Sequence, residues 1–295
     1  MMRRLGVGFT FLLMIAACGP SRAGPREERW FLDPEFAYEV ERNIVYATGA
    51  VRSPTVGEID LLLDVYRPAD ANLPPLRPGF ILIHGDGFRH GGKTNATMVA
   101  LASRYASLGY VSVSIDYRLV GDDPPTEDLA QTPGDPVWVA AAAARVDASR
   151  AVDWMRANAA AYRIDPNRIA IGGYSAGAIT AMGVAFRDSG VDAADVQVVL
   201  ALSGGLYGNE FFALAIDAGD PPLIMIHGMD DDAVPFSLAE AIETQALSAG
   251  LVYEFYALEG VGHETPSEFE RVIEGVTLAD RITNFFYVHL GLEAL

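Results

Sequence analysis

A serine flanked by glycines is the feature of this sequence that most clearly carries chemistry. Residues 172–178 read Gly-Gly-Tyr-Ser-Ala-Gly-Ala, with Ser175 at the centre. The apolar run 168–171 predicts a buried strand before it, and residues 178–186 predict a helix after it. Small residues two positions on either side of a serine permit the sharp strand-to-helix turn that exposes a reactive hydroxyl. We therefore expect Ser175 to be a nucleophile.

A serine hydroxyl needs a neighbouring base in order to react near neutral pH, and the sequence holds five histidines. His263 lies in a glycine loop, 259–264, directly after the last expected strand, where a loop can carry an imidazole over the sheet edge. The other four end apolar runs or lie in a glycine-rich loop or the last expected helix: His84, His227, His90 and His289. We predict that His263 is the base, the alternative being a hydrogen-bonded loop histidine.

An acidic group must orient that imidazole and stabilise its cation. Three consecutive aspartates follow the apolar run that ends in His227-Gly228: Asp230, Asp231 and Asp232. They are open to a second interpretation as a solvated acidic turn. Their place between Ser175 and His263 nevertheless gives the order Ser, Asp, His, which is expected for a nucleophile at a strand-turn-helix junction and differs from the chymotrypsin and subtilisin orders.

The rest of the chain predicts strands alternating with helices. Runs 38–46 and 59–66 predict antiparallel opening strands. Further strands are expected at 80–83, 111–116, 168–171, 196–202, 223–226 and 253–257, and helices at 95–108, 145–162, 178–186, 237–249 and 268–290. Strands that are apolar throughout indicate a parallel sheet covered by helices on both faces, which is an α/β fold. Segment 119–136 interrupts the alternation and is expected to pass over the carboxyl edge of the sheet.

Together these residues resemble the α/β-hydrolase superfamily. The shared motifs are the Ser175 turn, the Gly-x-Gly-His263 loop, and the motif His227-Gly228-x-x-Asp231-x-x-Val234-Pro235. The hexapeptides at 63–68 and 83–88 and the pentapeptide at 115–119 are similar to carboxylesterases related to hormone-sensitive lipase and to bacterial feruloyl-esterase-like enzymes. The resemblance extends from about residue 55 to the end. It implies a single-domain α/β-hydrolase fold with a mostly parallel sheet over 36–295, and Asp231 as the acid, with Asp230 and Asp232 remaining possible.

The oxyanion-hole motif departs from the pattern of these esterases. They usually carry His-Gly-Gly-Gly, whereas this chain has His-Gly-Asp-Gly at 84–87. The resemblance implies that the backbone N–H groups of Asp86, Gly87 and Ala176 stabilise the oxyanion. We expect the Asp86 carboxylate to point away, toward Arg89 or Lys93, the alternative being that it meets a polar group of the substrate.

Aromatic residues near these motifs predict the walls of a substrate pocket: Phe88, Trp138, Tyr174 and Tyr207. Segment 119–137 is short and acidic for a lipase lid, so we expect acyl chains of roughly two to six carbons, or aryl esters, because an added methylene contributes only where it meets apolar wall. No metal-ligand spacing and no phosphate-binding glycine loop occurs, so neither metal nor cofactor is expected.

The amino-acid composition limits the classes of partner that the protein is expected to bind. The formal net charge is −18, from 39 acidic and 21 basic residues, which argues against binding to nucleic acid or to an anionic membrane surface. The hydrophobic content of 51% is enough for a sizeable core. The expected partner is a small-molecule ester, and no oligomeric state is predicted.

The N-terminal residues read as an export signal. Arg3 and Arg4 precede an apolar run to residue 17 that is too short to span a bilayer, so residues 1–17 predict a signal peptide. The sequence Ile-Ala-Ala-Cys at 15–18 resembles the bacterial lipobox, which implies lipidation of Cys18, a tether over 18–35 and anchoring in the outer membrane. The alternative is cleavage after Ala23, which would give a soluble periplasmic or secreted protein.

These patterns favour a serine carboxylesterase that works through an acyl-enzyme on short-chain or aryl esters. One alternative is a serine peptidase similar to prolyl oligopeptidase, whose catalytic domain shares the turn and the triad order. Another is a non-catalytic surface protein that binds ligands on a hydrolase fold.

Overall fold

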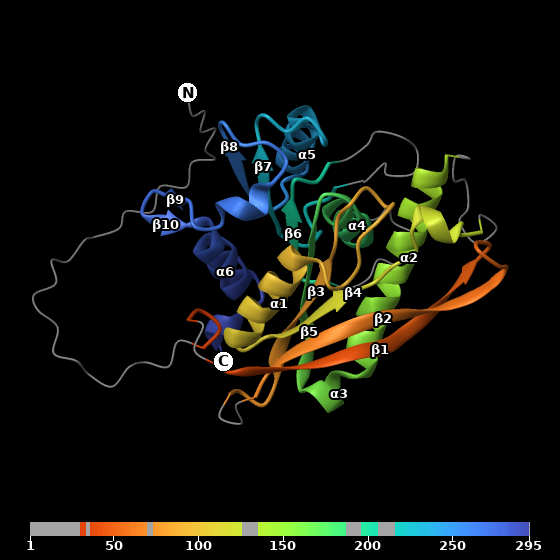
Figure 1. Cartoon of the computed structure of the whole chain (residues 1–295). Coiled ribbons are helices and arrows are strands. Elements are labelled where there is room, and N and C mark those ends of the chain that lie inside the picture. The colour runs from red at the N-terminus through yellow and green to blue at the C-terminus, as the bar shows by residue number, and fades with distance from the viewer. Residues whose placement is uncertain are drawn as a thin grey trace, which may run out of the picture.

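A single eight-stranded sheet forms the centre of the molecule (Figure 1). The computed structural model describes residues 30–33, 36–69, 73–125, 135–186, 196–205 and 216–294. The strand order is β1-β2-β4-β3-β5-β6-β7-β8. The strands are β1 (Tyr38–Val51), β2 (Gly57–Pro68), β3 (Arg77–Ile83), β4 (Val111–Ile115), β5 (Ile164–Tyr174), β6 (Val198–Leu202), β7 (Leu223–Gly228) and β8 (Tyr253–Leu258). β1 and β2 are antiparallel to each other and β2 to β4, and the remaining pairs are parallel.

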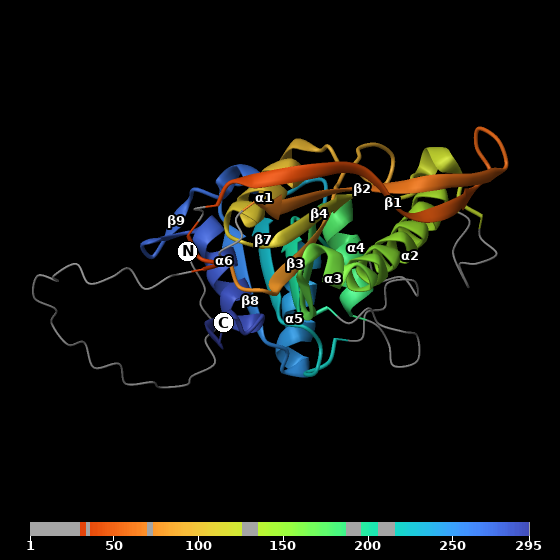
Figure 2. The same ribbon diagram turned by 90° about the horizontal axis from the view of Figure 1, so that it is seen from below.

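Helices cover both faces of the sheet (Figure 2). Successive side chains of a strand point to opposite faces, and β3 shows the consequence. Its Phe80 and Leu82 belong to a cluster with α1 (Ala96–Ser107) and α6 (Leu278–His289). Its Ile81 and Ile83 belong to a second cluster with α2 (Pro136–Ala157), α4 (Ala176–Ala185) and α5 (Phe236–Ala249). The α/β architecture predicted from the apolar strands is therefore confirmed.

Local sequence explains where the helices begin. Asn95 caps α1, because its side-chain oxygen accepts hydrogen bonds from the backbone N–H groups of Thr97 and Met98. Pro136 occupies the first turn of α2, and the Asp135 carboxylate accepts a hydrogen bond from Val137 N. α2 therefore starts nine residues before the expected 145, because this cap and the alanine run that follows it favour a helix. A four-residue helix, α3 (Ala159–Tyr162), follows the end of α2.

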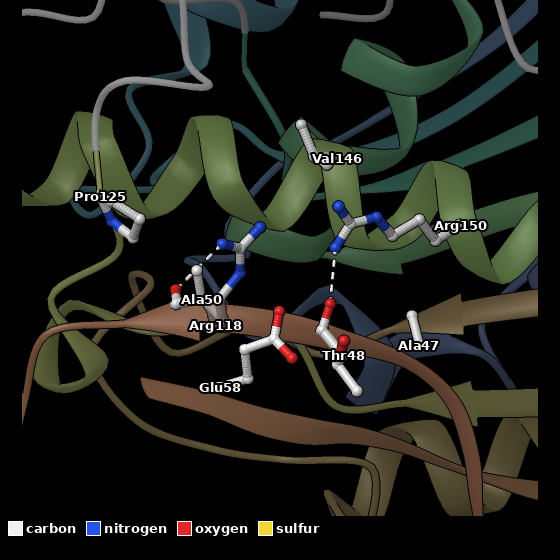
Figure 3. Close-up of a pocket in the computed structure, with 8 residues that line it drawn as sticks. All are labelled: Ala47, Thr48, Ala50, Glu58, Arg118, Pro125, Val146 and Arg150. Atoms are coloured by element: carbon white, nitrogen blue, oxygen red, sulfur yellow. Dashed lines mark hydrogen bonds between the residues drawn. The ribbon is translucent and has the colours of Figure 1, made fainter. Parts of the chain in front are cut away.

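The β1–β2 hairpin extends beyond the rest of the sheet along α2, and a cavity of about 300 Å³ lies between them (Figure 3). Arg118 makes a two-pronged ion pair with the fully buried Asp147 of α2 and donates to Ala50 O of the hairpin. Arg150 donates to Thr48 O at 2.8 Å. The positive charges of this cavity are thus used to attach the hairpin to α2.

The prediction of one closing helix over 268–290 is wrong. The chain forms a 3₁₀ turn at Thr265–Glu268 and then a small hairpin, β9 (Val272–Ile273) and β10 (Val276–Thr277), before α6. Glu274 and Gly275 both have positive φ, 52° and 83°, which is the geometry of a tight hairpin turn. Thr277 then starts α6, because its hydroxyl accepts a hydrogen bond from Asp280 N.

None of the helices in the described part of the chain has both the length and the apolar character needed to cross a bilayer. The predicted signal segment 1–17, Cys18 and the tether 18–35 lie outside the described residues, except for 30–33.

Candidate active site

The predicted nucleophile lies at the tip of a sharp turn between β5 and α4. Ser175 has φ 55° and ψ −120°, a conformation that L-residues rarely adopt, and it is the residue immediately before α4. Its backbone N–H donates to Leu202 O of β6 at 2.8 Å, which ties the turn to the neighbouring strand. The sequence thus folds here into the strained strand-turn-helix that the motif predicts.

The glycines on either side of the serine are required by close backbone contacts. A Cβ at Gly177 would lie 2.0 Å from Ile83 O, and one at Gly173 would lie 2.5 Å from the same oxygen. Real Cβ atoms do not approach backbone oxygens so closely. The turn therefore packs directly against the end of β3, where the oxyanion loop begins.

His263 connects the serine with an aspartate. Its Nε2 lies 2.9 Å from Ser175 Oγ, and its Nδ1 lies 2.8 Å from Asp231 Oδ2. Because a carboxylate only accepts, Nδ1 carries the proton, and Nε2 is left free to accept the serine proton. The three groups come from loops after β5, β7 and β8, at the carboxyl ends of parallel strands.

The structure selects one of the three candidate aspartates. The Asp231 side chain is fully buried, and its Oδ1 accepts hydrogen bonds from the backbone N–H groups of Ala233 and Val234. Asp230 and Asp232 are exposed. Asp231 therefore has the fixed position that an orienting acid needs.

A second histidine lies behind Asp231. Burial lowers the pKa of His227 below its ordinary value, so its ring is neutral near pH 7. Its Nε2 is 2.9 Å from Val234 O, which can only accept, so Nε2 carries the proton. The same N–H lies 3.2 Å from Asp231 Oδ2. His227 thus supports the carboxylate rather than only shaping a turn.

Two further contacts fix the loop that carries the base. The Ser203 hydroxyl donates to His263 O at 2.7 Å and lies 2.7 Å from the Thr265 hydroxyl. Tyr174, beside the nucleophile, donates from its hydroxyl to Glu264 Oε1 at 2.9 Å, and its ring packs against that of His263. Burial and then Glu264 raise the pKa of Tyr174, so the phenol stays protonated and continues to donate.

The predicted oxyanion loop has an unusual backbone. Asp86, Gly87 and Phe88 follow β3 with three consecutive positive φ values of 72°, 61° and 62°. Below this loop, Tyr117 stacks on His84 at 4.3 Å between ring centroids and donates to the carbonyl oxygens of His84 and Gly85. This support holds the loop beside Ser175 and Ala176, and Asp86, Gly87 and Ala176 all line one cleft.

The Asp86 carboxylate lies over Gly91, since a Cβ placed there would come within 2.7 Å of Asp86 Oδ2. The expected approach to Lys93 is wrong. Its ammonium group is 3.5 Å from Asp64 and 3.8 Å from Asp116, so these carboxylates already neutralise it.

The cleft above the serine has a volume of about 530 Å³. Three of the four predicted wall residues line it, namely Phe88, Trp138 and Tyr174, while Tyr207 lies outside the described residues. Trp138 comes from the first turn of α2 and not from the preceding loop. The other lining residues are Asp86, Gly87, Asp135, Val137, Ser175, Ala176, Ile179, Ala233, Val234, His263 and Glu264.

The sequence analysis did not identify four residues that support the triad or line the cleft: Ser203, His227, Asp135 and Glu264. Two had a visible signal. Glu264 directly follows the predicted base, and Asp135 precedes a proline, the pattern of a helix N-terminus. In the described ranges, no three His, Cys, Asp or Glu side chains are grouped closely enough to hold a metal ion.

Two family profiles match the chain, each over less than half of its length. The family described as BD-FAE matches residues 63–194, and the family described as Phospholipase/Carboxylesterase matches residues 146–276. The first includes the oxyanion loop and Ser175, and the second includes Ser175, Asp231 and His263.

Curated relatives match in part. Gut esterase 1 of Caenorhabditis elegans is 31% identical over 122 residues, 41% of this chain and 20% of that protein. The non-reducing polyketide synthase Preu3 of Preussia isomera is 29% identical over 147 residues, 46% of this chain and 5% of that protein. The chain thus spans a fifth or less of the length of these curated relatives.

Solved structures match over most of the fold. Esterase 2 of Thermogutta terrifontis, phosphoramylated by tabun, superposes with a TM-score of 0.63 at 23% identity, covering 86% of this chain and 95% of that one. Its butyrate-bound form gives 0.62 at 22% identity, covering 86% and 94%. The fold is therefore that of the α/β-hydrolases. Within that fold, Ser175, His263 and Asp231 form the Ser-His-Asp series of a serine hydrolase.

Proposed function

We propose that the protein hydrolyses short-chain or aryl carboxylic esters through an acyl-enzyme. The observation that carries this proposal is the hydrogen-bonded series Ser175–His263–Asp231, with 2.9 Å and 2.8 Å between the bonded atoms. The butyrate-bound and propionate-bound forms of the Thermogutta esterase support the preference for short acyl chains.

The chemistry follows from the geometry. Ser175 Oγ attacks the ester carbonyl while His263 Nε2 takes its proton, and Asp231 stabilises the imidazolium that forms. The N–H groups of the oxyanion loop and of Ala176 stabilise the negative charge on the carbonyl oxygen. His263 then returns the proton to the leaving alcohol. Water, deprotonated in turn by His263, releases the acid from Ser175.

A chain-length series tests the proposal. We expect kcat/KM for p-nitrophenyl esters to be highest at roughly two to six acyl carbons, because a cleft of about 530 Å³ offers limited apolar wall to longer chains. Ser175→Ala should abolish hydrolysis while leaving the fold intact. A maximum at ten carbons or more, faster cleavage of peptide amides, or an active Ser175→Ala variant would each contradict it.

We also propose that the protein is exported and anchored in the bacterial outer membrane through a lipid on Cys18, the residue after Ile-Ala-Ala at 15–17. The full-length chain, expressed in a Gram-negative host, should incorporate labelled palmitate, and Cys18→Ser should lose the label. A soluble mature protein that begins at Gly24 would contradict this anchor.

A further inference from the structure

Carboxylates and aromatic rings share the catalytic cleft. Its described lining contains three acidic residues that take no direct part in the proton transfers: Asp135, Glu264 and Asp86, the last with its Oδ2 over Gly91. All three side chains belong to exposed residues. The same lining contains the rings of Phe88, Trp138 and Tyr174 and contains no arginine or lysine.

We propose that this cleft prefers esters whose alcohol part carries a positive charge, such as a quaternary ammonium group. The inference rests on the proposed esterase function and names the substrate class of the same site. The cleft and its nucleophile show where the ligand sits, and the charge of its walls shows which ligands it favours.

The described hydrogen-bond partners of Glu264 and Asp135 are uncharged groups. Glu264 accepts a hydrogen bond from the neutral Tyr174 hydroxyl, and Asp135 accepts one from the backbone N–H of Val137. The positive end of α2 offsets part of the Asp135 charge. Among the described residues, no arginine or lysine forms an ion pair with Asp86, Asp135 or Glu264.

The side from which His263 protonates the leaving group indicates that the positive charge of a preferred ester lies on its alcohol part. His263 delivers the proton to the leaving alcohol, so the alcohol part lies on the side of the cleft from which His263 approaches Ser175. Glu264 follows His263 in the chain and lines that cleft. Aromatic faces beside carboxylates attract ammonium groups through both the ring quadrupole and the opposite charge.

Three esters of matched shape test the proposal: choline butyrate, its uncharged carbon analogue 3,3-dimethylbutyl butyrate, and the anionic 2-sulfoethyl butyrate. At low salt we expect kcat/KM to be at least about tenfold higher for the choline ester than for the neutral one, which corresponds to about 1.4 kcal/mol. The sulfonate ester should be the slowest. The preference should shrink as salt screens the exposed carboxylates.

The outcomes separate the two proposals. If none of the three esters is cleaved and p-nitrophenyl butyrate is also inert, the esterase function itself is wrong. If the neutral ester is cleaved as fast as the choline ester, or faster, only the charge preference is overturned.

Substitutions of single carboxylates test which residues cause the preference for the choline ester. Glu264→Gln and Asp86→Asn should each lower the ratio of choline to neutral kcat/KM about threefold, and this ratio cancels any general loss of active enzyme. Asp153→Asn is the matched control, because Asp153 lies on the exposed side of α2, about 27 Å along the helix from Asp135. An unchanged ratio in both cleft variants, or an equal fall in the control, would overturn the assignment.

Discussion

The strained backbone of Ser175 depends on the absence of side chains two residues away on either side, at Gly173 and Gly177. Its φ of 55° and ψ of −120° are maintained because Gly173 and Gly177 let the turn approach the carbonyl oxygen of Ile83. This approach also brings Ala176 next to the oxyanion loop, since that loop starts directly after Ile83. A single methyl group at either glycine would separate Ser175 from the loop that follows Ile83, in which the oxyanion donors are expected.

Gly177→Ala should therefore lower the stability of the protein and remove most of its activity. We expect a loss of at least about 3 kcal/mol in the free energy of unfolding, because the new Cβ would meet Ile83 O at 2.0 Å. Urea unfolding monitored by fluorescence measures it. Gly121→Ala is the control, since no atom lies within 4 Å of the Cβ it would add. Equal effects of the two substitutions would show that the close contact does not restrict the turn.

The three adjacent aspartates should differ sharply. Asp231→Asn should lower kcat on the order of 10⁴-fold, because the amide cannot hold His263 in the required tautomer. Asp230→Asn and Asp232→Asn change exposed side chains and should stay within about tenfold of the wild type. Steady-state kinetics on one short-chain ester compares them. A larger loss at a neighbour would transfer the role to that residue.

At the scale of elements, the site is an assembly of loops at the carboxyl ends of β3, β5, β6, β7 and β8. The His263 loop has no regular structure of its own. Ser203, at the end of β6, holds it through the hydrogen bond to His263 O. The neighbouring strand thus sets the position of the base.

Ser203→Ala should consequently lower kcat about tenfold with little change in KM, because the carbonyl of His263 loses the donor from β6 and keeps only the backbone N–H of Thr265 in its own loop. The matched control is Ser267→Ala, which removes an exposed hydroxyl that donates to Glu264 O in the same loop. That variant should stay within about twofold. If the two serines behave alike, the β6 contact does not position the base.

The sequence predicted those elements whose signal is local. The apolar runs of β3 to β8 indicated the parallel sheet, and the glycines around Ser175 indicated the turn, because close packing leaves no alternative residue there. The prediction of one helix over 268–290 is wrong in its first part. Gly275 lies there with a positive φ and forms a hairpin turn, so α6 begins only at Leu278. The contact between His227 and Asp231 could not be predicted from the sequence, because a histidine that shapes a turn and one that positions a carboxylate look identical there.

At the scale of the whole molecule, buried neutral histidines should make stability depend on pH. Burial lowers the pKa values of His84 and His227 in the folded protein. In the unfolded chain their pKa values are about 6.5. As the pH falls below that value, the unfolded state binds protons that the folded state rejects, so stability is lost until the folded pKa is reached.

The free energy of unfolding should therefore fall between about pH 7 and pH 5, and His84→Gln should make that fall shallower. Denaturant titrations at several pH values measure the slope. The control is His90→Gln, which changes an exposed histidine and should leave the slope almost unaltered. A slope that is equally steep in all three proteins would contradict the contribution of the buried ring.

The proposed esterase activity depends on Ser175 as the activated nucleophile. Its most direct test is to incubate the purified protein with a fluorophosphonate and to locate the adduct by peptide mass spectrometry while following esterase activity. We predict one adduct per chain, on Ser175, forming in step with the loss of activity, and much slower labelling in His263→Ala. Labelling of another residue, or full activity in a protein labelled at Ser175, would show that Ser175 is not the nucleophile.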